Sequence, residues 1–175
     1  DLLCSTLQAI ASHLCLDVTA CGEYYFPMST LLYIVKVGST YPGVAARFGD
    51  FEDWILSGLG LVSVEARVVN AEAGAQLPHP AECAGIVVTG SHSMITDDPP
   101  WSMRVEKWIP SVLAVGVPFL GICYGHQLLA RATGGEAGYH PAGKEFGTVT
   151  LHLLPSRAND PLFASLPGTF PVHAT

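Results

Sequence analysis

Short apolar runs alternate with segments of helical spacing along most of this chain. Four of the runs are rich in β-branched and aliphatic residues and are bounded by glycine or proline, which predicts buried strands. They cover residues 30–37, 63–69, 84–88 and 117–122. Residues 50–59 and 101–112 place apolar side chains three and four positions apart, which predicts helices. This order predicts an α/β fold in three layers, with a mostly parallel sheet and helices on both faces.

Local signals refine these elements. Asp50 followed by Asp53 is typical of a helix start. The segment Tyr41–Gly43 predicts a turn. Pro110 predicts a kink in the second helix, or a break of that helix into two pieces.

The two ends of the chain carry weaker patterns. Residues 1–28 are interpreted as an N-terminal extension of unknown role, with leucines at helical spacing over residues 2–15. Residues 136–139 and 147–154 predict an antiparallel hairpin added to the edge of the sheet. Residues 170–175 predict the start of another strand.

The composition indicates a globular domain with a large core. Hydrophobic residues make up 49% of the 175 residues and charged residues 13%, so we expect residues 29–175 to form a single domain. The net charge is −7 and the eight basic residues are scattered, which argues against a nucleic-acid partner. Because no apolar run approaches the roughly 18 residues of a membrane span, we expect no membrane partner either.

The cysteines do not form a recognisable framework. They lie at positions 4, 15, 21, 83 and 123, with neither a CxxC nor an HxxxH spacing in the chain. We therefore expect no disulfide scaffold, no metal site and no cofactor, and a reducing cytoplasmic location.

Cys123 has a sequence context that the other cysteines lack. It follows the apolar run 117–122, lies between Gly121 and Gly125, and precedes a segment of helical spacing that Gly134–Gly135 ends. A strand, a tight turn with a nucleophilic residue and a helix together are typical of a nucleophile elbow. We expect this elbow to follow a central strand of the sheet. The glycines allow the sharp turn and keep side chains away from the sulfur, while the helix N-terminus favours the thiolate.

A thiolate that attacks a carbonyl needs hydrogen-bond donors for the developing oxyanion, and a base. The predicted donors are the backbone N–H of Tyr124 and that of Gly90 or Ser91, in the loop after the 84–88 strand. The base is harder to place. His126 is expected to point away from the sulfur, and His92 is interpreted as an exposed loop histidine that is also in a position to touch substrate.

Three stretches now point to a family. The run Pro118–Gln127 resembles the nucleophile signature of the class I, triad-type glutamine amidotransferases. Val88–His92 is similar to their oxyanion loop, and Glu145–Gly147 is similar to an E-F-G segment best known from the amidotransferase part of GMP synthetases. The runs Gly38–Pro42 and Arg47–Trp54 favour the free-standing, GMP synthase-like members. The fold of this family is flavodoxin-like.

The resemblance implies a chemistry. Cys123 would attack the side-chain amide of glutamine, ammonia would leave, and water would hydrolyse the glutamyl thioester. The resemblance also implies that Gln127, with Ser91 and the backbone near Gly90, holds the glutamine. A synthetase partner would then receive the ammonia.

The same resemblance leaves the base open. In the family, a short β segment ending in a small residue leads into the catalytic histidine, and Val172–Thr175 matches that lead-in. We therefore expect the histidine and its glutamate to follow Thr175, which would make the domain incomplete and the chain a poor glutaminase; the alternative is that His173 serves as the base. Two other functions also remain open, namely a hydrolase of γ-glutamyl peptides or amides, and a non-catalytic binding protein.

Overall fold

The computed structural model describes residues 31–60, 65–141, 143, 146–160 and 162–174. The extension 1–28, including the helix expected over residues 2–15, lies outside the described residues, as do residues 61–64 at the start of the second predicted strand. The described residues fall into two compact units, one of residues 31–138 and one of residues 139–174.

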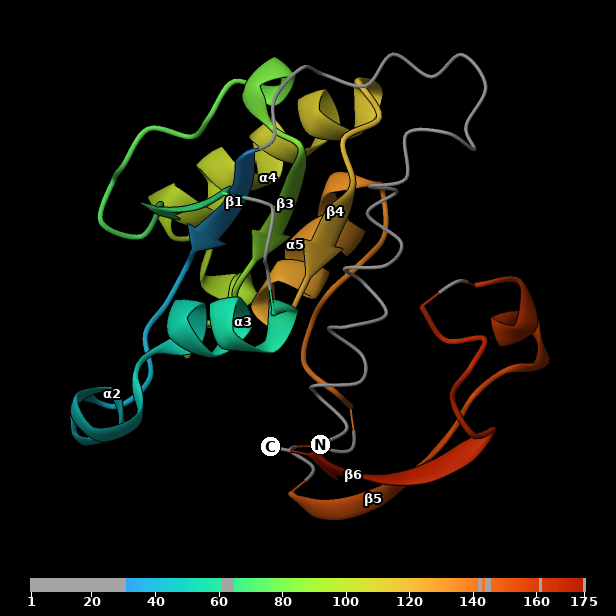
Figure 1. Ribbon diagram of the computed structural model, residues 1–175. Helices are drawn as coiled ribbons and strands as arrows, with labels where there is room; N and C mark the ends of the chain where they lie inside the picture. The colour runs from blue at the N-terminus through green and yellow to red at the C-terminus, as the bar shows by residue number, and fades with distance from the viewer. Residues whose placement is uncertain (1–30, 61–64, 142, 144–145, 161, 175) are drawn as a thin grey trace. The chain divides into compact units, whose positions relative to one another are not determined.

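A parallel sheet forms the centre of the first unit (Figure 1). Its strands are β1 (Leu31–Lys36), β2 (Glu65–Asn70), β3 (Gly85–Val88) and β4 (Phe119–Gly121). They lie in the order β2-β1-β3-β4, and every neighbouring pair is parallel. Val35 of β1 is in register with Val88 of β3, and Val88 with Gly121 of β4, so three strands end at the same edge.

β4, which leads into Cys123, lies at one end of this strand order. The expectation that the elbow would follow a central strand is therefore wrong for the described sheet. The two later strands, β5 (Gly147–His152) and β6 (Thr169–Ala174), form a two-stranded sheet of their own.

Helices cover both faces of the sheet, as predicted. On one face, α4 (Pro100–Ala114) and α5 (Tyr124–Ala132) pack on alternate strand residues such as Val35 and Val88. On the other face, Leu32 and Ile34 are buried on the side of α3 (Phe51–Leu59), whose own buried residues are Ile55 and Leu59. Since strand side chains alternate between faces, a run buried at every position produces this three-layer arrangement.

Two prolines lie within helices, and the first of them occupies a segment that was predicted as a turn. Pro42 does not sit in an isolated turn, because it is the first residue of α2 (Pro42–Phe48), where its missing N–H costs nothing. Pro110 neither breaks α4 nor ends it, and the helix runs through it for 15 residues. The neighbouring Ile109 and Val112 are fully buried, so core packing offsets the lost backbone hydrogen bond.

Helix ends follow the sequence signals closely. Asp50 and Asp53 form the predicted capping box at the start of α3, and Gly60 ends that helix in the left-handed conformation. At the end of α5, the N–H of Gly135 donates to Ala130 O at 2.8 Å and that of Gly134 to Arg131 O at 3.1 Å. This pair of bonds is a Schellman motif, which confirms the predicted stop.

The second unit is an antiparallel strand pair with a 3₁₀ helix at Pro155–Asn159. β5 and β6 run in register from Gly147 opposite Ala174 to His152 opposite Thr169. The predicted hairpin partner 136–139 is not a strand, and β6 takes its place. Within β6, exposed and half-buried residues alternate, as expected for a strand with one solvated face.

Candidate functional site

Cys123 occupies the sharp turn between β4 and α5. Its backbone has φ 52° and ψ −104°, and its thiol is exposed. A positive φ is costly for a residue with a Cβ and persists only where the surroundings enforce it. The predicted elbow is therefore present, and its nucleophile-type residue is the strained one.

Two glycines make this turn possible by letting backbones approach. A Cβ added to Gly121 would lie 2.6 Å from His126 N and would also overlap the backbone of Gly125. A Cβ added to Gly125 would lie 2.6 Å from the carbonyl oxygen of Val88. The glycines therefore allow α5 to begin directly against β3 and β4. None of the close contacts involves the sulfur, so clearance of the sulfur is not the reason that these positions require glycine.

Backbone hydrogen bonds fix the turn on both sides of Cys123. Ile122 N donates to Val88 O at 3.0 Å, and Gly125 N donates to Thr89 O at 3.2 Å. Gln127 N donates to Cys123 O at 3.1 Å and so starts α5. Backbone carbonyls at the end of β3 thus hold Ile122, just before the cysteine, and Gly125, two residues after it.

The loop after β3 brings Gly90 against Cys123. A Cβ added to Gly90 would lie 3.5 Å from Cys123 Cβ and 3.9 Å from Sγ. In the described part of the chain, neither the N–H of Gly90 nor that of Tyr124 has a hydrogen-bond acceptor. The structure thus places both predicted oxyanion donors beside the cysteine, while their role stays a prediction.

Ser91 joins this loop to the loop after β1. A Cβ added to Gly38 would lie 2.6 Å from the Cα of Ser91, so the two loops touch through their backbones. The Ser91 hydroxyl accepts a hydrogen bond from Ser93 N at 3.1 Å. Part of its hydrogen-bonding capacity therefore shapes the loop, and its predicted contact with substrate remains a prediction.

His92 is held on the β1 side of the same loop. Its ring centroid lies 4.8 Å from that of Tyr41 and 6.0 Å from that of Phe51. Cys123 follows β4, which pairs with β3 on the side opposite to β1. His92 itself is exposed, which confirms its interpretation as an exposed loop histidine. Its position on the β1 side argues against it as the base.

The remaining predicted residues are distributed over both units. His126 and Gln127 are exposed on the first turn of α5, and Gln127 remains a predicted substrate ligand. His173 lies on β6, where its Nδ1 is 3.1 Å from the hydroxyl of Thr148. Glu145 lies outside the described residues.

A buried ion cluster supports the loop after β1, and sequence reasoning did not identify it. The Lys36 ammonium lies 2.7 Å from Asp50 Oδ2 and 2.5 Å from Glu52 Oε1. Burial by itself raises the pKa of Asp50, but hydrogen bonds from Lys36 and from the N–H groups of Thr40 and Phe51 lower it to about 2. Burial likewise lowers the pKa of Lys36, and the two carboxylates raise it overall. Asp50 thereby ties β1, its loop and α3 together.

A second buried polar contact anchors the start of α5. The Tyr124 hydroxyl donates to Ser102 Oγ at 2.8 Å, and the Tyr124 ring lies 5.3 Å from that of Trp101. Burial raises the pKa of Tyr124, so the phenol stays a neutral donor.

Further along α5, Arg131 pairs with Asp98 at 2.8 Å and with Glu106 at 3.0 Å. These residues hold α5 against α4 and were missed because their partners are distant in sequence.

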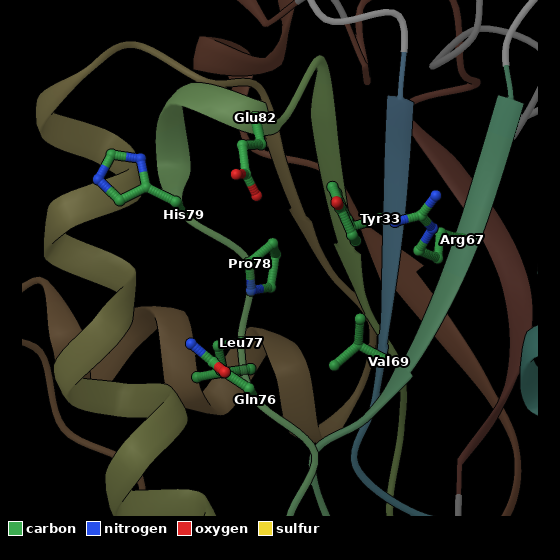
Figure 2. Close-up of a pocket in the computed structure, with 8 residues that line it drawn as sticks. All are labelled: Tyr33, Arg67, Val69, Gln76, Leu77, Pro78, His79 and Glu82. Carbon is green, nitrogen blue, oxygen red and sulfur yellow. The ribbon is translucent and has the colours of Figure 1, made fainter.

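A hollow of about 380 Å³ lies elsewhere in the first unit (Figure 2). Residues of β1, β2 and the loop before β3 line it, namely Tyr33, Arg67, Val69, Gln76, Leu77, Pro78, His79 and Glu82. None of the predicted site residues is among them. Within the described residues, no three His, Cys, Asp or Glu side chains come together as a metal site, and no helix is long and apolar enough to cross a membrane.

Comparison with known proteins identifies the family. Residues 47–173 match the family model of class I glutamine amidotransferases. The chain belongs to this family. It is 34% identical over 122 residues to the glutamine-hydrolysing GMP synthase of Aeropyrum pernix, covering 69% of this chain and 21% of that enzyme. It is 31% identical over 145 residues to the GMP synthase of Streptococcus mutans, covering 78% of this chain and 23% of that enzyme. This amidotransferase chain thus spans about a fifth of the length of these relatives.

Solved structures agree on the fold. A glutamine amidotransferase from Thermotoga maritima superposes with a TM-score of 0.61 at 19% identity, over 82% of this chain and 59% of that one. A glutamine amidotransferase from Methylobacillus flagellatus gives a TM-score of 0.55 at 26% identity, over 74% of this chain and 49% of that one. The first likeness, at this low identity, speaks for the fold alone. Together they support the predicted flavodoxin-like, class I amidotransferase architecture.

Proposed function

We propose that this amidotransferase chain hydrolyses the side-chain amide of glutamine to glutamate and ammonia, with Cys123 as the nucleophile. The observation that carries the proposal is the strained, exposed Cys123 at a strand–helix turn, packed against Gly90, in a chain of this family. Cys123 is also the N-cap of α5, so negative charge on the sulfur faces the positive end of the helix dipole.

The first half of the reaction forms a thioester. The Cys123 sulfur bonds to the amide carbon, and the electron pair of the C=O bond moves to the oxygen. The N–H groups of Gly90 and Tyr124 would stabilise this oxyanion, since Gly90 packs against Cys123, Tyr124 directly follows it, and neither N–H has an acceptor in the described part of the chain. When the carbonyl re-forms, the C–N bond breaks and the nitrogen takes a proton and leaves as ammonia.

The second half releases glutamate. A water oxygen attacks the thioester carbon, its proton goes to a base, and the same two N–H groups stabilise the second oxyanion. The C–S bond then breaks and Cys123 is regenerated. Gln127 on the exposed face of α5 and Ser91 in the oxyanion loop would hold the rest of the glutamine.

The proton carrier in both halves is a histidine by family resemblance. Among the described histidines, His92 is packed between Tyr41 and Phe51. His173 on β6 is the described histidine that we retain as a candidate for this role.

The ammonia would pass to a synthetase partner. The relatives named as GMP synthases are about five times longer than the matched region, so they contain other parts that this chain does not match. The acceptor of the ammonia would be bound by such a part or by a separate subunit. A cytoplasmic location fits this role.

The test uses a chloroketone analogue of glutamine. We expect it to alkylate Cys123 with saturation, to be slowed by free glutamine, and to leave Cys123→Ser unlabelled. Cys83→Ser is the matched control, because Cys83 is buried, and it should be labelled like the unmodified chain. Absence of saturable labelling at Cys123 would refute the proposal and favour the non-catalytic alternative. Faster turnover of γ-glutamyl peptides than of glutamine would instead favour the peptide hydrolase.

A further inference from the structure

We propose that the Tyr124 side chain is a positioning residue for the oxyanion. Its hydrogen bond to Ser102 would hold the Tyr124 backbone N–H in the orientation that the oxyanion needs. This inference rests on the proposed function, in which that N–H is one of the two donors. It adds a residue on a different helix, Ser102, to the machinery of the site.

The contact is buried and directional. Tyr124 and Ser102 are each 1% exposed, and the phenol O–H donates to Ser102 Oγ at 2.8 Å. The Trp101 ring lies beside the Tyr124 ring, with centroids 5.3 Å apart and planes tilted by 42°. Ser102 and Trp101 together fix the ring of Tyr124, the residue that directly follows the proposed nucleophile.

The backbone of Cys123 explains why such an anchor is needed. A φ of 52° with a ψ of −104° is unfavourable for cysteine and relaxes unless both flanking residues are held. The residue before it, Ile122, is held by its N–H bond to Val88 O at 3.0 Å. In the Cys123–Tyr124 peptide, the Cys123 carbonyl accepts hydrogen bonds from His126 N at 3.0 Å and Gln127 N at 3.1 Å, while the N–H must stay free for the substrate oxygen. The side chain adds a further anchor at the Tyr124 Cα, because a displacement of this atom would shift the N–H and would draw the ring away from Ser102.

The position of Ser102 shows that core packing alone does not explain the pair. Ser102 stands on the buried face of α4, in a row with Val105, Ile109 and Val112 at spacings of three and four residues. An apolar residue would fill this position without a desolvation cost, and phenylalanine would pack on Trp101 as tyrosine does. A buried hydrogen bond between two hydroxyls contributes little net stability, but it fixes the orientation of the groups that it joins. Here the oriented residue is Tyr124, whose backbone N–H is the proposed oxyanion donor.

The experiment compares two reagents on Cys123 in the full chain. Alkylation by the chloroketone analogue of glutamine uses the oxyanion donors, whereas iodoacetamide reports only the exposure and reactivity of the thiol. Tyr124→Phe should slow the chloroketone about tenfold and change the iodoacetamide rate less than about twofold, because displacing a donor costs less than the 10²–10³-fold of losing one. Ser102→Ala should do the same, and the double variant should be no slower than either single one.

The control is Tyr33→Phe, which removes the hydroxyl of another tyrosine that is only 5% exposed. That hydroxyl has no hydrogen-bond partner in the described part of the chain. It should leave the ratio of the two rates unchanged. If the rates with both reagents fall together, or if the ratio is unchanged in Tyr124→Phe and Ser102→Ala, the inference is wrong. Ser102→Ala decides the question if Tyr124→Phe does not fold. If the unmodified chain shows no saturable chloroketone labelling, the proposed function fails first and the inference fails with it.

Discussion

Gly125 offers a sharp test of how the elbow is built. It is the second residue of α5, it is buried, and its φ is not in the left-handed region. Helix propensity therefore favours Gly125→Ala by about 1 kcal/mol. Packing opposes it, because the new Cβ would lie 2.6 Å from Val88 O, 2.9 Å from Val88 Cβ and 3.0 Å from Val88 C.

The magnitude follows from what would have to move. Val88 is fully buried in β3 and is paired with strands on both sides, so neither its backbone nor its Cβ can yield as a flexible side chain would. Overpacking of a rigid core costs about 1–3 kcal/mol, and this contact belongs at the upper end of that range. After the gain in propensity is subtracted, we expect Gly125→Ala to destabilise the chain by about 2 kcal/mol.

The assay is urea unfolding followed by far-UV circular dichroism. Gly43→Ala is the matched control, since Gly43 is also the second residue of its helix but has open space around its Cβ position. We expect the control to be neutral or slightly stabilising, and Gly125→Ala to lower the urea midpoint and to slow chloroketone labelling of Cys123. If Gly125→Ala is as stable as the unmodified chain, the argument that α5 begins in backbone contact with β3 is refuted.

Three further predictions concern the buried charges and the thiols. The pKa of Asp50 is depressed to about 2 from an unfolded value near 4, so its stabilisation of about 2 kcal/mol is present above pH 4 and is lost as the pH falls toward 2. The free energy of unfolding of Asp50→Asn, measured in urea, should therefore differ from that of the unmodified chain at pH 7 and converge with it near pH 2. A difference that stays constant with pH would contradict this. Lys36→Met leaves Asp50 and Glu52 without their cation and should lower the free energy of unfolding by about 3–5 kcal/mol in the same assay. Glu52→Gln should lower it less, because Glu52 Oε2 has no partner among the described residues. Equal losses of stability in the two variants would show that pairing with Lys36 is unimportant. Burial and the neighbouring carboxylate raise the pKa of Cys83 to about 11, so mass spectrometry after brief iodoacetamide treatment at pH 7 should find Cys123 modified and Cys83 intact, and comparable modification of both would contradict the burial of Cys83.

Local patterns in the sequence determined most of the first unit. Runs buried at every position predict parallel strands covered on both faces, because only such strands lack a polar side. The capping box at Asp50 and the stop at Gly134–Gly135 act within four or five residues, so they can be recognised without the fold. The elbow around Cys123 was predictable for the same reason, since its glycines, strand and helix are contiguous.

Contacts between distant segments were decided only by the tertiary structure. The 136–139 segment was predicted as a strand, but pairing in the second unit is between β5 and β6, because strand partners depend on register over long range. His92 is an exposed loop histidine, as the sequence indicated, but only the structure shows its contacts with the rings of Tyr41 and Phe51. The Lys36–Asp50–Glu52 cluster and the Tyr124–Ser102 bond join residues 14 to 22 positions apart.

What the sequence by itself determined is thus which residue is the proposed nucleophile and that it lies on a sharp turn, since both follow from neighbours along the chain. The tertiary structure decided what holds that turn in place. A positive φ at Cys123 is unfavourable in isolation, and it persists because Val88 and Thr89 of the β3 end, and Ser102 of α4, contact the residues on either side of it. Such contacts depend on the folding of the whole unit, and no local pattern specifies them.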